Sequence, residues 1–157
     1  MTSTETQPSG PVFASRKPRM NHVAMSLAPD ELDEEHRKLR ADFLGDVFGF
    51  YDLPMLTEDR YRQVFQVHNI EQFVFLIADD PPMTAPRMDH WGMSVSTQED
   101  FDECASRATA WAERHPDAVD LIAPHFDQHG DFLKLHSFYV KYRLPIMVEV
   151  QFFEWLT

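Results

Sequence analysis

The sequence predicts an α+β fold built from two copies of a βαβββ unit. A ten-residue segment occurs twice, as PRMNHVAMSL at 18–27 and as PRMDHWGMSV at 86–95, with six of the ten positions identical. Each copy precedes a stretch with helical periodicity, and each such stretch precedes three short runs of strand-forming residues. A segment that recurs with the same elements after it indicates a duplicated unit.

In the first copy, the segment 18–27 is expected to form a strand and Asp30 to cap the following helix. Acidic residues come first in this helix and basic residues later, which suits the helix dipole. Gly49 is suited to its C-terminal end. The expected buried stripe consists of Leu32, Leu39, Phe43 and Val47. Strands are then expected over 53–56, 61–68 and 72–78.

In the second copy, the segment 86–95 forms the first strand and Thr97 caps the helix, with Asp100 three residues later. Pro116 ends this helix. Its expected buried stripe consists of Phe101, Cys104, Ala105, Ala108 and Trp111. Strands follow over 119–125, 132–141 and 146–153.

Length and composition predict one globular domain. The chain has 157 residues, of which 43% are hydrophobic, enough to close a core. Residues 1–17 are rich in Ser, Thr and Pro and are expected to be a disordered tail, which leaves a domain over 18–157 with modules at about 18–80 and 86–157.

Charge and cysteine content restrict the partners. With 14 Lys and Arg against 26 Asp and Glu, the net charge is −12, which argues against nucleic acid as a partner. The single cysteine cannot form an internal disulfide, and no long apolar run or leader is apparent, so we expect a cytoplasmic protein without a membrane role.

One face of each repeated strand carries a histidine followed by small residues. Alternation places His22, Ala24 and Ser26 on this face in the first copy, and His90, Gly92 and Ser94 in the second. Small residues after a histidine leave open space, which indicates a cavity. A single strand histidine is usually a hydrogen-bonded interior or rim residue. Two at equivalent positions favour a shared ligand role, because a pseudo-twofold axis would bring them together.

Glu149 is the candidate third ligand. It lies among apolar residues in the segment 146–153, where an unpaired charge would be costly, although an acid facing water at a strand edge is the alternative. His22, His90 and Glu149 supply two imidazoles and one carboxylate. This set is typical of Fe(II) sites that keep positions open for substrate and O₂.

The paired βαβββ units with these three residues resemble the vicinal oxygen chelate superfamily, over about residues 18–157. This superfamily includes extradiol dioxygenases, glyoxalase I and antibiotic-resistance proteins. The resemblance implies a curved, half-barrel mixed sheet around a metal site. In the extradiol branch the catalytic tyrosine lies ten residues before the glutamate ligand, which corresponds to Tyr139. Its His-Gly pair corresponds to His129 and Gly130, one residue further from Tyr139 than usual, so the hairpin is expected to absorb one residue.

Two departures leave the acid/base group open. Tyr142–Ile146 replaces the usual Asp-Pro-x-Gly-Asn turn, and Phe75 stands where the branch has a histidine. His136 is a candidate substitute, although on a regular strand it faces away from Tyr139. His125 and Arg143 are candidate substrate contacts. Each of His125, His129 and His136 is also compatible with a solvated or structural role.

The resemblance implies an Fe(II)-dependent extradiol dioxygenase that cleaves a catechol with O₂, similar to the single-domain L-DOPA 2,3-dioxygenases. We expect a homodimer, because a small open sheet leaves apolar strand surface exposed. One alternative is a glyoxalase-like isomerase in which Glu71 or Gln72 is a fourth ligand, which would favour Ni or Zn. Another is a drug-binding resistance protein, which has no need of the three ligands together.

Overall fold

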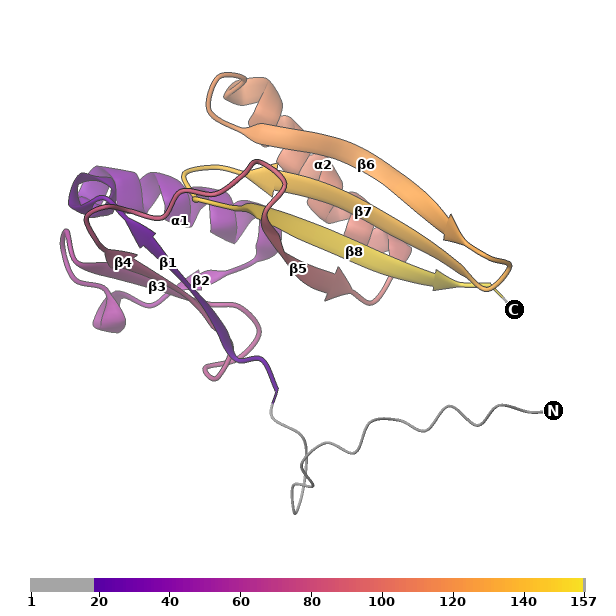
Figure 1. The fold of residues 1–157 in the computed structure, drawn as a ribbon, viewed down its shortest axis with the longest axis horizontal. Coiled ribbons are helices and arrows are strands. Elements are labelled where there is room, and N and C mark those ends of the chain that lie inside the picture. The colour runs from indigo at the N-terminus through magenta and orange to yellow at the C-terminus, as the bar shows by residue number, and fades with distance from the viewer. Residues whose placement is uncertain (1–18, 157) are drawn as a thin grey trace, which may run out of the picture.

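The computed structural model describes residues 19–156 and confirms the α+β class and the two βαβββ modules (Figure 1). The first module contains β1 (His22–Leu27), α1 (Glu34–Phe48), β2 (Tyr51–Asp52), β3 (Arg62–Gln66) and β4 (Phe73–Ala78), with short 3₁₀ turns at Pro29–Leu32 and Pro54–Leu56. The second contains β5 (His90–Val95), α2 (Gln98–Arg114), β6 (Asp120–His129), β7 (Leu133–Lys141) and β8 (Met147–Trp155). The tail expected over 1–17 lies outside the described residues.

Each module forms its own four-stranded mixed sheet. The strand orders are β1-β4-β3-β2 and β5-β8-β7-β6, so the two sheets have equivalent topology. In each, the repeated strand runs parallel to the last strand, and the other pairs are antiparallel. Within residues 19–156, β1 and β5 are therefore both edge strands, and no ladder joins the two sheets into one.

The helix ends follow the predicted signals with one correction. Thr97 caps α2, since its hydroxyl oxygen accepts from the Asp100 backbone N–H at 3.0 Å. Gly49 ends α1 with a φ of 70°, a left-handed conformation that glycine adopts at little cost. The predicted cap at Asp30 is wrong. Asp33 caps α1 instead, because Pro29–Leu32 form a separate 3₁₀ turn before it. Among residues 19–156 no helix combines the length and apolar character needed to cross a membrane.

The strand predicted over 53–56 is also wrong. Pro54–Leu56 form a 3₁₀ turn, and the short second strand lies just before it, at Tyr51–Asp52. Proline has no backbone N–H to donate to a strand partner, so the apolar run around Pro54 cannot continue the ladder.

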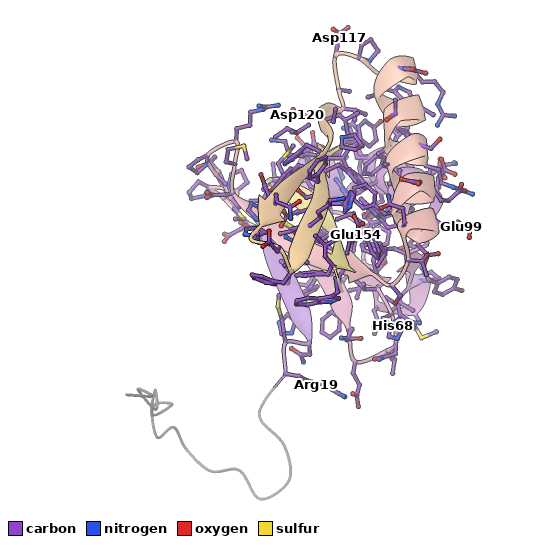
Figure 2. The ribbon with its side chains drawn as sticks, turned by 90° about the vertical axis from the view of Figure 1, so that its right-hand side faces the viewer. Arg19, His68, Glu99, Asp117, Asp120 and Glu154 are labelled. Carbon is purple, nitrogen blue, oxygen red and sulfur yellow. The ribbon has the colours of Figure 1, made fainter. Side chains whose placement is uncertain are left out.

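The helices pack on each other and join the two modules. The Phe43 ring of α1 contacts Trp111 of α2 and Tyr142, each with 5.3 Å between ring centroids. The Asp46 carboxylate accepts from Trp111 Nε1 at 2.7 Å. Figure 2 shows α2 along one side of the molecule, from Glu99 in its first turn to Asp117 just past its end. A single buried cluster contains residues of both modules.

Arg40 is a buried cation that connects four segments. Its side chain is 0% exposed and donates to the backbone oxygens of Glu31 and Arg143, at 2.8 and 3.0 Å, and to Gln63 Oε1 at 2.7 Å. Burial lowers the pKa of Arg40 to about 10, so the guanidinium stays charged at neutral pH. These bonds hold α1 to the 3₁₀ turn before it, to β3, and to the β7–β8 turn of the other module.

We predict that Arg40→Met lowers the free energy of unfolding by about 2–4 kcal/mol, because it leaves three buried acceptors without donors. Urea denaturation followed by circular dichroism measures the change. Lys38→Met is the control, since Lys38 lies exposed on the same helix and pairs only with Asp42. It should change stability by less than about 0.5 kcal/mol, and an equal effect of both variants would contradict the prediction.

Candidate metal centre

The second sheet has an apolar face and an open face. Val148, Val150, Phe138 and Val140 are buried in the core on the side of α2. Alternation directs Glu149 and Tyr139 to the opposite face, where they lie directly across from each other on β8 and β7. Glu149 is 6% exposed despite its charge. A carboxylate this buried needs a partner.

His90 is that partner. Its Nε2 atom lies 3.3 Å from Glu149 Oε2, across the β5–β8 ladder in which Gly92 is paired with Glu149. A Cβ at position 92 would meet Glu149 Oε2 at 3.4 Å, so the carboxylate lies directly over the glycine. His90 Nδ1 donates to the Met88 backbone oxygen at 2.7 Å. Because a carbonyl can only accept, the neutral ring then presents an unprotonated Nε2 to Glu149.

His90 Nε2 and Glu149 Oε2 are close enough to bind one cation between them. Imidazole nitrogen and carboxylate oxygen are both common ligands of divalent transition metals, and an Nδ1–H fixed by a carbonyl is the usual support of a metal-binding histidine. The donor set at His90 and Glu149 therefore fits a metal ion.

Tyr139 lies against both of these residues. Its ring meets the His90 ring edge-on, with 5.1 Å between centroids. Glu149 raises the pKa of the Tyr139 hydroxyl, because the neutral phenol can donate to the carboxylate whereas a phenolate would be repelled, and burial adds to the rise. Without a bound cation, Tyr139 is a proton donor.

A bulge in β6 brings His125 to the same face. Ile122 pairs with Tyr139 and His125 with Ser137, so β6 holds one more residue than β7 over this stretch. His125 stacks on Tyr139 at 6.1 Å, its Nδ1 donates to the Ala123 backbone oxygen, and its Nε2 accepts from Ser137 Oγ at 3.2 Å. The bulge lies beside Pro124, before His129, so it does not change the spacing between His129 and Tyr139.

His22 occupies the equivalent place in the first module. Its Nδ1 donates to Asn21 Oδ1 at 2.8 Å, and its ring stacks on Phe73 at 4.8 Å, which leaves Nε2 unpaired among the described residues. Over residues 19–156, however, no three His, Cys, Asp or Glu side chains gather as metal ligands. The fold therefore brings His90 and Glu149 together but does not bring His22 of the same chain to them.

The structure does not place His136 or His129 with this cluster. His136 faces the α2 side of the sheet, where its Nε2 donates to Glu154 Oε2 at 2.7 Å and its ring meets Phe101. His129 pairs with Leu133 and, through it, with Trp155, six residues along β8 from Glu149. At about 3.3 Å per residue this is roughly 20 Å away. Strand alternation and strand length separate both residues from Tyr139.

Arg143 and Glu71 are likewise engaged elsewhere. Arg143 lies in the β7–β8 turn and donates to Glu31 Oε2 at 3.2 Å, in a contact between the modules. Glu71 is exposed and forms an ion pair with Arg19. Gln72, in contrast, shares a small cavity with His22, Trp91 and Gly92.

Sequence reasoning missed Asn21 and Ser137, which orient His22 and His125. Asn21 was readable as the residue directly before the repeated histidine. Ser137 became recognisable only with the bulge, because its partner His125 would otherwise point to the other face.

No protein-family model matches the sequence, and no curated protein is detectably similar to it. Solved structures do match the fold. Lactoylglutathione lyase from Agrobacterium tumefaciens is similar with a TM-score of 0.57 and 18% identity, over 87% of this chain and 94% of its own. The fosfomycin resistance protein FosX from Listeria monocytogenes is similar with a TM-score of 0.56 and 15% identity, over 87% of this chain and 94% of its own. A glyoxalase/bleomycin resistance protein/dioxygenase family enzyme from Burkholderia phytofirmans PsJN is similar with a TM-score of 0.55 and 13% identity, over 84% of this chain and 96% of its own.

The chain has the fold of the vicinal oxygen chelate superfamily. At these identities the likeness concerns the fold. FosX from Listeria monocytogenes has also been solved, as a mutant, in complex with Mn(II) and 1S,2S-dihydroxypropylphosphonic acid, and that structure matches this chain with a TM-score of 0.53 and 13% identity, over 86% of this chain and 92% of its own.

Proposed function

We propose that the chain is a metal-dependent enzyme that uses His22, His90 and Glu149 as ligands, and that it cleaves a catechol ring with O₂ as an Fe(II) extradiol dioxygenase. The observation that carries the proposal is the buried Glu149 carboxylate, which faces His90 Nε2 at 3.3 Å while His90 Nδ1 donates to the Met88 carbonyl. When bound, Fe(II) with two imidazoles and one carboxylate supplies open positions at which a catechol and O₂ are activated side by side.

Tyr139 and His125 supply the proton chemistry. The Tyr139 hydroxyl lies across the ladder from Glu149, so it can donate a hydrogen bond to a substrate oxygen held beside the ligands. His125 stacks on Tyr139 and is held by Ser137, so in its neutral form it can accept a proton from the substrate hydroxyl. Both groups lie on the open face of the sheet, on the side of the ligands.

We further propose that a homodimer completes the site. His22 lies on β1 and His90 on β5, and both are edge strands whose free edges can pair with another chain. Phe153 and Trp155 stack on each other with exposed rings near the end of β8, which gives apolar surface for a subunit to cover. When β1 of one subunit lies beside β5 of the other, the partner subunit's His22 joins His90 and Glu149.

A glyoxalase-like isomerase is the second candidate. Gln72 lines the same cavity as His22 and could act as a fourth ligand, whereas Glu71 is occupied by Arg19. Four protein ligands would leave less room for O₂ and favour Ni or Zn. This candidate requires Gln72 to turn toward His22.

We predict that anaerobically purified protein holds about one Fe(II) per chain and that His22→Ala, His90→Ala and Glu149→Ala each lose it, because two remaining ligands seldom retain Fe(II). Elemental analysis after gel filtration measures the metal. His136→Ala is the matched control and should keep it, since His136 faces α2. Full iron in any one of the three variants would remove that residue from the site.

Mixing two variants tests the shared site. A heterodimer of one His22→Ala subunit and one Glu149→Ala subunit contains one site with all three ligands and one site that lacks both His22 and Glu149. Random exchange of equal amounts should therefore restore about a quarter of the wild-type iron. If His22 and Glu149 of the same chain form the site, mixing restores none. A monomer at all concentrations by light scattering would also contradict the shared site.

We predict that the iron-loaded enzyme converts L-DOPA and one O₂ to a yellow ring-opened product. Tyr139→Phe should keep iron and lower kcat by roughly 10²–10⁴-fold, the usual range for loss of an acid/base group. His136→Ala should leave kcat within a few-fold. Oxygen uptake and visible absorbance follow the reaction. Isomerisation of a thiol adduct of methylglyoxal, with no oxygen uptake on any catechol, would favour the isomerase.

A further inference from the structure

The open face of the first sheet contains a cavity that the metal ligands do not explain. It has a volume of about 400 Å³, within the range of small-molecule sites, and His22 lies on its rim. Its floor is formed by β3 and β4 side chains that share the face of His22, namely Arg62, Val64, Phe73 and Phe75. Leu56 and Ile70 close it from the sides. The cavity is thus apolar, with one cation.

Arg62 lies at the far end from His22. One row of paired residues across β1, β4 and β3 consists of His22, Phe73 and Gln66. The row that contains Arg62 consists of Ser26, Ile77 and Arg62. The two rows are four residues apart, or about 13 Å along the strands. Phe73 and Phe75 occupy the space between them. A ligand that reaches from His22 to Arg62 therefore passes over aromatic rings.

The Arg62 guanidinium is not fully engaged. Its Nε atom is buried and has no hydrogen-bond partner among the described residues. The nearest carboxylate, Glu58, is 3.8 Å away, and the Tyr61 ring lies 5.9 Å away. The neighbouring Arg60, by comparison, donates to Asp30 at 2.5 Å. A buried donor without a partner is costly, and a bound anion would remove this cost.

We propose that this cavity binds the side chain of the substrate and that Arg62 binds a carboxylate at its end. The substrate is then a catechol that carries a carboxylate on a short chain, with its hydroxyls at the metal beside His22 and its chain over Phe73 and Phe75. This assignment rests on the proposed function for the position of the catechol. Arg62 selects among catechols and takes no part in ring opening.

The test compares ligands in which a carboxylate is replaced by its uncharged methyl ester. L-DOPA and 3-(3,4-dihydroxyphenyl)propionate are each paired with their methyl esters, and binding to the iron-loaded protein is measured by calorimetry without O₂. Wild-type protein should bind each acid about 10- to 100-fold more tightly than its ester, the range for a charge-assisted contact. Arg62→Ala should bind acid and ester equally, at the affinity of the wild-type ester. Arg62→Lys should retain part of the preference.

Two further variants separate recognition from structure. Arg60→Ala should keep the full preference for acids, because Arg60 pairs with Asp30 outside the cavity. Glu58→Gln should strengthen binding of the acids a few-fold and leave the esters unchanged, because it removes a competing carboxylate. A structural role for Arg62 would not produce this difference.

Three outcomes would overturn the proposal: neither acid binds, acids and esters bind equally to the wild type, or Arg62→Ala weakens acids and esters alike. These outcomes are independent of turnover. If the preference for acids depends on Arg62 but no catechol consumes O₂, the dioxygenase reaction fails and the Arg62 site stands.

Discussion

Directional contacts centred on Arg40 and Trp111 set how the two modules sit against each other. Phe43 packs edge-on against Trp111 and buries apolar surface, and the Arg40 guanidinium directs its donors in a planar fork. One donor reaches the β7–β8 turn, at Arg143 O, and another reaches Gln63 on β3. The second module is therefore held to α1 in one orientation. In that orientation β1 and β5 keep their free edges, and the candidate ligands are divided between the modules.

Strand alternation keeps stability and chemistry apart within each module. One face of each sheet supplies the core under its helix, and the other carries His22 in the first module and His90 and His125 in the second. His90 and His125 donate through Nδ1 to the carbonyl two residues before them, at Met88 and Ala123. Each imidazole thus presents Nε2 to the open face through a local contact. The strand pairing of β5 and β6 then determines where the two imidazole rings lie.

Patterns of short range predicted much of this structure. The repeat and the helical periodicity predicted the two modules, and alternation placed His22 and His90 on equivalent faces, whereas Tyr139 followed from the resemblance to the extradiol branch. The predictions that were wrong or incomplete have physical causes that strand alternation does not describe. A bulge at Pro124 shifts the register of β6, the 3₁₀ turn at Pro29–Leu32 moves the helix cap, and the position of His22 relative to Glu149 depends on packing between modules. Arg62 gave no sequence signal, because one arginine on a strand is ordinary until the cavity around it is known.

The two copies of the repeated strand hold their histidines by different means. His90 is fixed by the Met88 main chain, and a carbonyl is present whichever residue occupies that position. His22 is fixed by the Asn21 side chain, which only a residue with a suitable acceptor can replace. A substitution at position 21 can therefore release the His22 ring, whereas a substitution at position 88 leaves the acceptor of His90 in place. The Nδ1 contact of His22 can thus be altered by exchanging one side chain, whereas the Nδ1 contact of His90 is built into the main chain.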